Sequence, residues 1–152
     1  HIEEGAATRV ELADAATQAV DRWRERAERL ASSLSLRGDM SVAHADPTDV
    51  DQIFDNLLDN AVAYAPGPIE LSYGSEDGRA WLRVRDHGPG IPVADRAKVM
   101  DRFYRGAARP PEAGLGLAIA RELCEKWGGA IAVDEAEGGG TAITASFPAA
   151  RP

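Results

Sequence analysis

Two asparagines that could meet one ligand stand in the segment Thr48–Tyr64, whose apolar residues recur at helical spacing. Because Asn56 and Asn60 are four residues apart, a helix would place both amides on one face. An amide oxygen is a neutral hard ligand that suits Mg²⁺, which usually keeps waters and is shared with substrate phosphates. The pair therefore predicts a metal and phosphate site, although a solvated helix face would use the same residue types.

A carboxylate at the end of an apolar strand is the second candidate group. Asp86 follows the alternating segment Ala80–Arg85 and opens the sequence Asp-His-Gly-Pro-Gly-Ile. Such a carboxylate could accept a hydrogen bond from an exocyclic amine. Gly88 and Gly90 would let the backbone approach a flat ring, and Ile91 offers an apolar contact. The alternative is a plain loop turn, where Asp and Gly are favoured in any case.

A third candidate is the sequence Gly114-Leu115-Gly116-Leu117, at which we expect a helix to begin. The start of a helix leaves N–H groups and the positive end of the dipole facing outward, which favours phosphate. Glycines that merely permit close packing are the alternative. The sequence is not a Walker loop, because no Gly-Lys-Ser/Thr follows.

Basic residues ahead of these glycines form the fourth candidate. The sequence Phe103-Tyr104-Arg105 precedes residues 106–113, whose glycine, alanine and proline content suggests a mobile lid. Arg105 and Arg109 could offer bidentate contacts to phosphate oxygens. Either arginine could equally be a solvated surface charge.

Helical spacing predicts three main helices that would carry these groups. They cover Val10–Leu30, Thr48–Tyr64 and Leu115–Trp127, and a short helical stretch is expected between Pro92 and Phe103. Asp46 and Pro47 suit the cap and first turn of the second helix, and Pro66 ends it.

Alternating and turn-bounded segments predict the strands. We expect strands Ser33–Arg37 and Ser41–Ala45 joined by a tight turn, a hairpin of Ile69–Tyr73 with Ala80–Arg85, and a closing hairpin of Ala130–Asp134 with Thr141–Phe147. The predicted fold class is α/β, a two-layer sandwich of about three helices on one mixed, mainly antiparallel sheet.

The composition predicts one domain without general affinity for polyanions. The chain has 152 residues, of which 44% are hydrophobic, and a net charge of −8, so we expect no nucleic acid partner and no direct membrane contact. The single cysteine, Cys124, excludes an internal disulfide and suits a reducing cytoplasm, where we expect it to be a small core residue. We assign residues 10–149 to the domain and residues 1–9 to a linker.

In this order, the four candidate sequences resemble the N, G1, F and G2 boxes of the histidine-kinase catalytic domain. That domain belongs to a superfamily with the gyrase, heat-shock chaperone and mismatch-repair ATPases. The matches run from about Asp51 to Ile119, and a family-like Gly-Gly-Thr hairpin follows at Gly139–Thr141. The resemblance implies a Bergerat-type ATP-binding fold with ATP and Mg²⁺ as cofactors.

The resemblance also implies residue roles. Asn60 would ligate Mg²⁺, Asn56 would support metal or phosphate, and Asp86 would bind the adenine amino group. Asn56, Asn60 and Arg105 would be the catalytic residues. The implied nucleotide-binding set is Asn56, Asn60, Tyr64, Asp86, Gly88, Gly90, Ile91, Arg105, Gly114, Leu115, Gly116, Leu117 and Thr141.

One position favours a kinase over a hydrolase. The related ATPases carry Glu as a general base four residues before the metal-binding Asn, whereas Asn56 cannot accept a proton at neutral pH. The resemblance therefore implies transfer of the γ-phosphoryl of ATP to a histidine on a separate dimerisation domain, and indirectly to a response regulator. It also implies a domain that is monomeric in isolation, on the cytoplasmic side of a parent protein anchored in the inner membrane.

Two departures from the family pattern keep alternatives open. Ala63 stands where such kinases often have a basic residue, and Glu112 stands where the last box usually has a glycine. A degenerate nucleotide-binding regulatory module without phosphotransfer is therefore one alternative. A serine kinase of the same superfamily, acting on an anti-sigma-factor partner, is the other.

Overall fold

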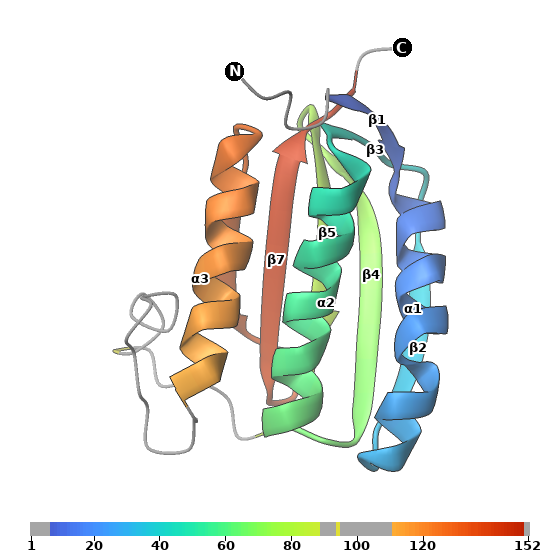
Figure 1. Cartoon of the computed structure of the whole chain (residues 1–152), viewed down its shortest axis with the longest axis vertical. Coiled ribbons are helices and arrows are strands. Elements are labelled where there is room, and N and C mark those ends of the chain that lie inside the picture. Colours follow the sequence, from blue (N-terminus) through green and yellow to red (C-terminus); the bar gives the residue numbers. More distant parts are fainter. Residues whose placement is uncertain (1–6, 89–93, 95–110, 151–152) are drawn as a thin grey trace.

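The computed structural model describes residues 7–88, 94 and 111–150, and of residues 111–114 it describes only their place in a helix. Three helices and seven strands follow one another along this part of the chain (Figure 1). In chain order they are β1 (Thr8–Glu11), α1 (Leu12–Arg29), β2 (Ser33–Gly38), β3 (Val42–Ala45), α2 (Pro47–Tyr64), β4 (Pro68–Glu76), β5 (Arg79–Arg85), α3 (Pro111–Lys126), β6 (Ala130–Glu135) and β7 (Thr141–Pro148).

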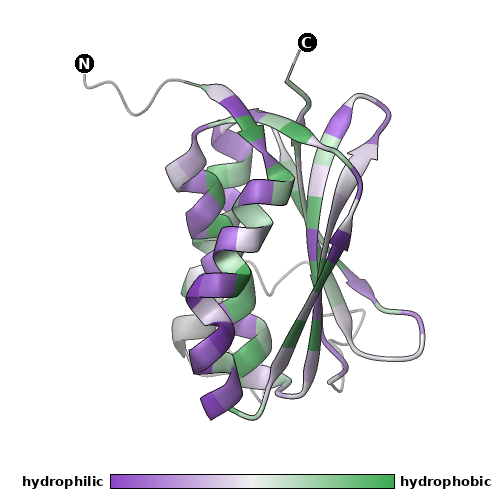
Figure 2. Cartoon of the chain, turned by 90° about the vertical axis from the view of Figure 1, so that its right-hand side faces the viewer, coloured by the Kyte–Doolittle hydropathy of each residue, from purple (hydrophilic) through white to green (hydrophobic). Residues whose placement is uncertain are grey.

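The elements form two layers, as predicted. The main sheet has the strand order β2-β4-β5-β7-β6, in which only β2 and β4 are parallel. The helices lie together on one face of this sheet, and the side view in Figure 2 separates the two layers. β1 and β3 make a small antiparallel sheet of their own at one end. No helix in the described ranges is long and apolar enough to cross a membrane.

The core lies between the helix layer and the sheet. Because neighbouring strand residues point to opposite faces, β5 and β7 each bury every second side chain against the helices, and the first half of β4 does the same. Phe54, Leu57 and Phe147 are among the largest fully buried side chains. Each such side chain stabilises the fold by roughly 1.5–3 kcal/mol through removal of apolar surface from water. Cys124 is buried in this core, as predicted, and its burial raises the pKa of the thiol to about 12.

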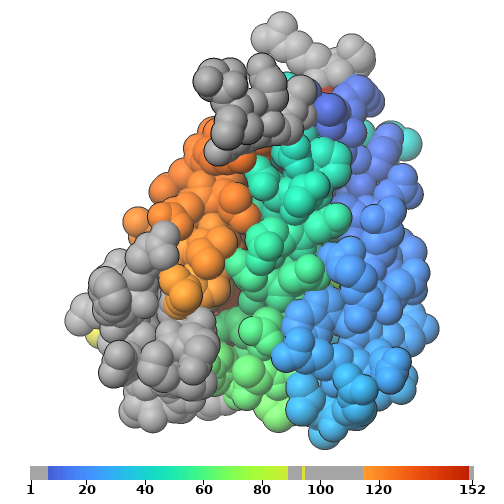
Figure 3. Space-filling model, in the orientation of Figure 1, coloured from blue at the N-terminus to red at the C-terminus, as the bar shows by residue number. Residues whose placement is uncertain are grey.

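Helix α2 forms where the sequence predicts it, and local chemistry explains both ends. The Asp46 carboxylate accepts hydrogen bonds from the amides of Thr48 at 2.7 Å and Asp49 at 3.4 Å. Pro47 occupies the first turn, where its missing N–H costs no hydrogen bond. The helix ends at Tyr64, just before Ala65 and Pro66. In the view of Figure 3, α2 appears as a band between α3 and α1.

The prediction that a tight turn joins Ser33–Arg37 to Ser41–Ala45 in a hairpin was wrong. Both segments are extended, but β2 pairs in parallel with β4, whereas β3 pairs with β1. The pairing of β2 is set by the core, since Leu34 lies beside Ile69 and Leu36 beside Leu71. Pairing with a strand more than thirty residues away therefore replaces the local hairpin.

Two predicted helix starts were also displaced. The first helix begins at Leu12 instead of Val10, because Val10 belongs to β1 and is buried there. The third helix begins at Pro111, about one turn before the predicted start at Leu115. The short helix expected between Pro92 and Phe103 lies outside the described residues, apart from Ala94.

Candidate functional site

Asn56 joins α2 to α3. Its Nδ2 donates a hydrogen bond of 3.0 Å to the carbonyl of Gly116, and its Oδ1 accepts one of 2.9 Å from Gln52. Asn60 follows one turn later on the same helix and is only 6% exposed. A buried amide of this kind is a polar group in an apolar setting, so its position is fixed by its partners. Asn56 and Asn60 thus lie along the side of α2 that leads towards α3.

Two acidic residues of α2, Asp55 and Asp59, face α1. Asp55 accepts hydrogen bonds from Arg22 at 2.9 Å and from the indole of Trp23 at 2.8 Å, both on α1. Asp59 lies 3.6 Å from Arg26, which is also on α1. These two carboxylates hold α2 to α1.

Asp86 comes directly after β5 and is 7% exposed. Its Oδ1 accepts hydrogen bonds from the backbone amides of Gly88 at 2.9 Å and Thr141 at 3.1 Å. The amide of Asp86 in turn donates to the carbonyl of Thr141 at 2.9 Å. Within the described ranges, no donor is recorded for the other carboxylate oxygen, Oδ2. The site thus holds a carboxylate in one orientation through a single oxygen.

Ala65 and Gly140, two residues that were not predicted from the sequence, fix the turn that carries Asp86. A Cβ on Gly88 would lie 2.5 Å from the Cβ of Ala65, so the turn packs directly on the end of α2. A Cβ on Gly140 would lie 2.1 Å from the carbonyl oxygen of Asp86, and Gly140 also has a φ of +90°. Only glycine suits that position. The run Gly138–Gly140 was a sequence signal for Gly140, whereas nothing in the sequence marks Ala65.

The start of α3 departs from the prediction. Because the helix begins at Pro111, Gly114, Leu115 and Gly116 lie inside it. In an α-helix only the amides of the first turn lack a partner, so those of Leu115 and Gly116 point to carbonyls of the preceding turn. Leu117 is fully buried in the core, whereas Leu115 is 43% exposed.

The described candidate residues converge around α2. Asn56 contacts α3 through Gly116, and Ala65, nine residues later, lies against the turn that carries Asp86. At 1.5 Å per residue, these two contacts are about 14 Å apart along the helix. Figure 1 shows the end of α2 and the beginning of α3 at the same end of the molecule. Tyr64, half-buried, is the last residue of α2. Gly90, Ile91 and Arg105 lie outside the described residues.

Comparison with known proteins places the chain in a family. Residues 45–151 match the family described as histidine kinase-, DNA gyrase B- and HSP90-like ATPase. The signal transduction histidine-protein kinase AfsQ2 of Streptomyces coelicolor is 36% identical over 143 residues, which cover 91% of this chain and 26% of AfsQ2. This chain spans about a quarter, or less, of the curated relatives it matches.

Two solved structures are similar over nearly all of the chain. The mycobacterial sensor histidine kinase MprB has a TM-score of 0.82 at 30% identity, covering 97% of this chain and 99% of that one. Full-length ShkA in complex with AMPPNP has a TM-score of 0.85 at 27% identity, covering 98% of this chain and 32% of that one. The family match, the relatives and the shared fold agree on one assignment. The chain belongs to the histidine kinase-, DNA gyrase B- and HSP90-like ATPase family and, within it, is the ATP-binding catalytic domain of a sensor histidine kinase.

Proposed function

We propose that this domain holds ATP and Mg²⁺ beside α2, with the adenine at Asp86 and the phosphates towards Asn60 and Asn56. The observation that carries the proposal is the Asp86 carboxylate, whose Oδ1 is held by Gly88 and Thr141 while Oδ2 has no donor among the described residues. A carboxylate oriented in this way can accept a hydrogen bond from an exocyclic amine. Tyr64 would line the base, because it lies next to Ala65, on which the Asp86 turn packs.

Asn60 would be the protein ligand of the metal. The oxygen of its buried amide is a type of ligand that Mg²⁺ binds together with waters and phosphate oxygens. Bound there, Mg²⁺ would neutralise charge on the phosphates. Asn56 would help to place the phosphates, and its neutral amide, engaged by Gln52 and Gly116, would not activate water.

Phosphate contacts from the beginning of α3 depend on its first turn. Leu115 and Gly116 could present their amides to a phosphate only if that turn opened, since both residues are helical here. A Cβ at Gly116 would meet nothing within 4 Å, so space is available at this position. Arg105, Gly90 and Ile91 stay predictions from the resemblance.

The proposed reaction uses a histidine that this chain does not supply. An imidazole nitrogen of a dimerisation and phosphotransfer domain would form a bond to the γ-phosphorus, while the bond from phosphorus to the β–γ bridging oxygen breaks and ADP leaves with that electron pair. This domain would contribute positioning and charge neutralisation. A response regulator would then receive the phosphoryl group, and the parent protein would be anchored in the membrane.

The test mixes this domain with a cognate dimerisation domain, Mg²⁺ and labelled ATP. We expect acid-labile, base-stable phosphate on the partner, and its loss with Asn60→Ala or Asp86→Asn. Asp134→Asn, on the exposed strand β6, is the matched control and should transfer phosphate like the native chain. Tight ATP binding without any transfer would instead favour the regulatory module, and absence of binding would contradict the site.

A further inference from the structure

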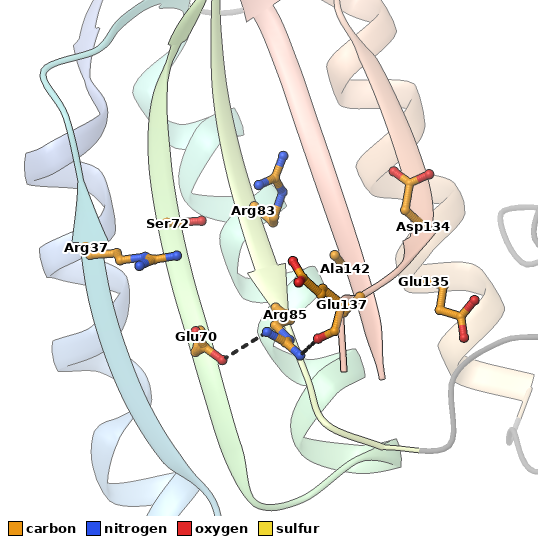
Figure 4. Close-up of a pocket in the computed structure, with 10 residues that line it drawn as sticks. Arg37, Glu70, Ser72, Arg83, Arg85, Asp134, Glu135, Glu137 and Ala142 are labelled. Atoms are coloured by element: carbon orange, nitrogen blue, oxygen red, sulfur yellow. Dashed lines mark hydrogen bonds and ion pairs between the residues drawn. The ribbon is translucent and has the colours of Figure 1, made fainter. Parts of the chain in front are cut away.

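The two residues on either side of Asp86 meet one carboxylate on the helix-free face of the sheet. His87 Nε2 lies 2.7 Å from Oε2 of Glu70, and Nη1 of Arg85 lies 3.7 Å from the same oxygen. Glu70 is directly opposite Arg85 in the pairing of β4 with β5. Figure 4 shows Glu70 and Arg85 side by side in a groove of about 290 Å³. Asp86 itself is turned inward, towards Thr141.

Arg85 connects this carboxylate to the hairpin that holds Asp86. Its Nη2 donates to the carbonyl of Gly139 at 3.3 Å and to that of Glu137, the contact drawn in Figure 4. The same hairpin continues to Thr141, whose amide donates to Asp86 Oδ1. Among the described residues, none forms a hydrogen bond with the buried Nε of Arg85, so this placement of the guanidinium carries a desolvation cost. Other contacts must hold Arg85 in this position. Two of them are the hydrogen bonds to backbone carbonyls described above, and the third is the ion pair with Glu70.

We propose that Glu70 and His87 are positioning residues for nucleotide binding, which hold the Asp86 turn from the opposite face of the sheet. The proposal rests on the adenine-binding role of Asp86 proposed above. Glu70 contacts both neighbours of Asp86, and these contacts restrict the turn between them. His87 lies 17 residues after Glu70 in the sequence, so its contact ties the turn to β4 as well as to its own strand.

The experiment measures the Kd for AMPPNP with Mg²⁺ by calorimetry. Glu70→Ala and His87→Gln should each raise Kd by about fivefold or more relative to the native chain. Glu70→Gln keeps an acceptor for His87, so it should restore much of the affinity that Glu70→Ala loses.

Glu76→Ala is the matched control, since Glu76 is also on β4 and opposite an arginine, Arg79, but at the far end of the strand. Its Kd should change by less than about twofold. A Glu70→Ala or His87→Gln chain that binds like the native chain, or a Glu70→Gln chain that binds as weakly as Glu70→Ala, would overturn the proposal. His87 is exposed, so His87→Gln carries the test if Glu70→Ala fails to fold. If Asp86→Asn also has no effect, the proposed function fails; if Asp86→Asn alone weakens binding, only this inference fails.

Discussion

Gly140 shows how single residues shape the site without touching a ligand. It has a φ of +90°, and its Cα lies so close to the carbonyl of Asp86 that any side chain would collide with it. Its neighbour Gly139 has a similar φ of +105° but nothing within 4 Å of a built Cβ. A side chain at either position would therefore strain the backbone, but only a side chain at position 140 would also collide with a neighbouring atom.

This pair gives a prediction at the residue scale. Gly140→Ala should lower the free energy of unfolding by about 1–3 kcal/mol more than Gly139→Ala, because only the first adds an overlap to the strain. Chemical denaturation of both variants measures the difference. Gly140→Ala should also weaken nucleotide binding, since it displaces the Asp86 turn. Equal stability losses in the two variants would show that the Asp86 carbonyl moves aside freely.

At the scale of elements, α3 is attached to α2 near both of its ends. Asn56 reaches Gly116 near the beginning of α3, and Asp49 takes hydrogen bonds from Lys126 at 3.0 Å and the Trp127 indole at 2.8 Å near its end. Lys126 also lies 5.2 Å from the Trp127 ring. The Asp49 side chain in the second attachment is only 18% exposed.

Asp49→Ala should therefore lower the free energy of unfolding by about 1–3 kcal/mol, since it leaves two donors without their acceptor. Asp59→Ala is the control, because the Asp59–Arg26 pair joins α2 to α1 with both side chains largely exposed. Its loss should cost less than about 1 kcal/mol. Thermal unfolding of the two variants compares the attachments. A larger loss for Asp59→Ala would contradict the ranking by exposure.

The elements also show which parts of the structure are readable from sequence. α2 is predictable because its cap, its apolar spacing and Pro66 all lie within one segment. β1 was missed because it has only four residues and its buried Val10 also fits the periodicity of the helix that follows. The early start of α3 had a signal in Pro111, a residue favoured in the first turn of a helix.

No comparable feature of the sequence predicts the pairing of β2 with β4 or the contact of Gly88 with Ala65. Both join residues that are distant in sequence, and they depend on how the helix layer settles on the sheet. The candidate residues Asn56, Asn60 and Asp86 could be chosen from residue type and spacing, but the interactions that orient them could not. Glu70 illustrates this, since no sequence pattern relates it to His87.

At the scale of the whole molecule, the net charge of −8 contrasts with the neutral amides of Asn56 and Asn60 on α2. The carboxylates of Asp55 and Asp59 contact α1, and that of Asp49 contacts the end of α3. On the proposed function, a triphosphate with its metal would approach α2 at the two amides, about two turns beyond Asp49.

The most direct test of the adenine assignment compares Mg²⁺ complexes of ATP and ITP by calorimetry, on the native chain and on Asp86→Asn. ITP has a carbonyl where ATP has the exocyclic amine, so it cannot donate to Asp86 from that position. The native chain should bind ATP about tenfold or more tightly than ITP, which is about the value of one hydrogen bond to a charged group. Asp86→Asn should bind ATP less tightly and narrow the gap, because its amide can donate to the ITP carbonyl. Equal affinity of the native chain for ATP and ITP, or a gap that Asp86→Asn leaves unchanged, would contradict the account.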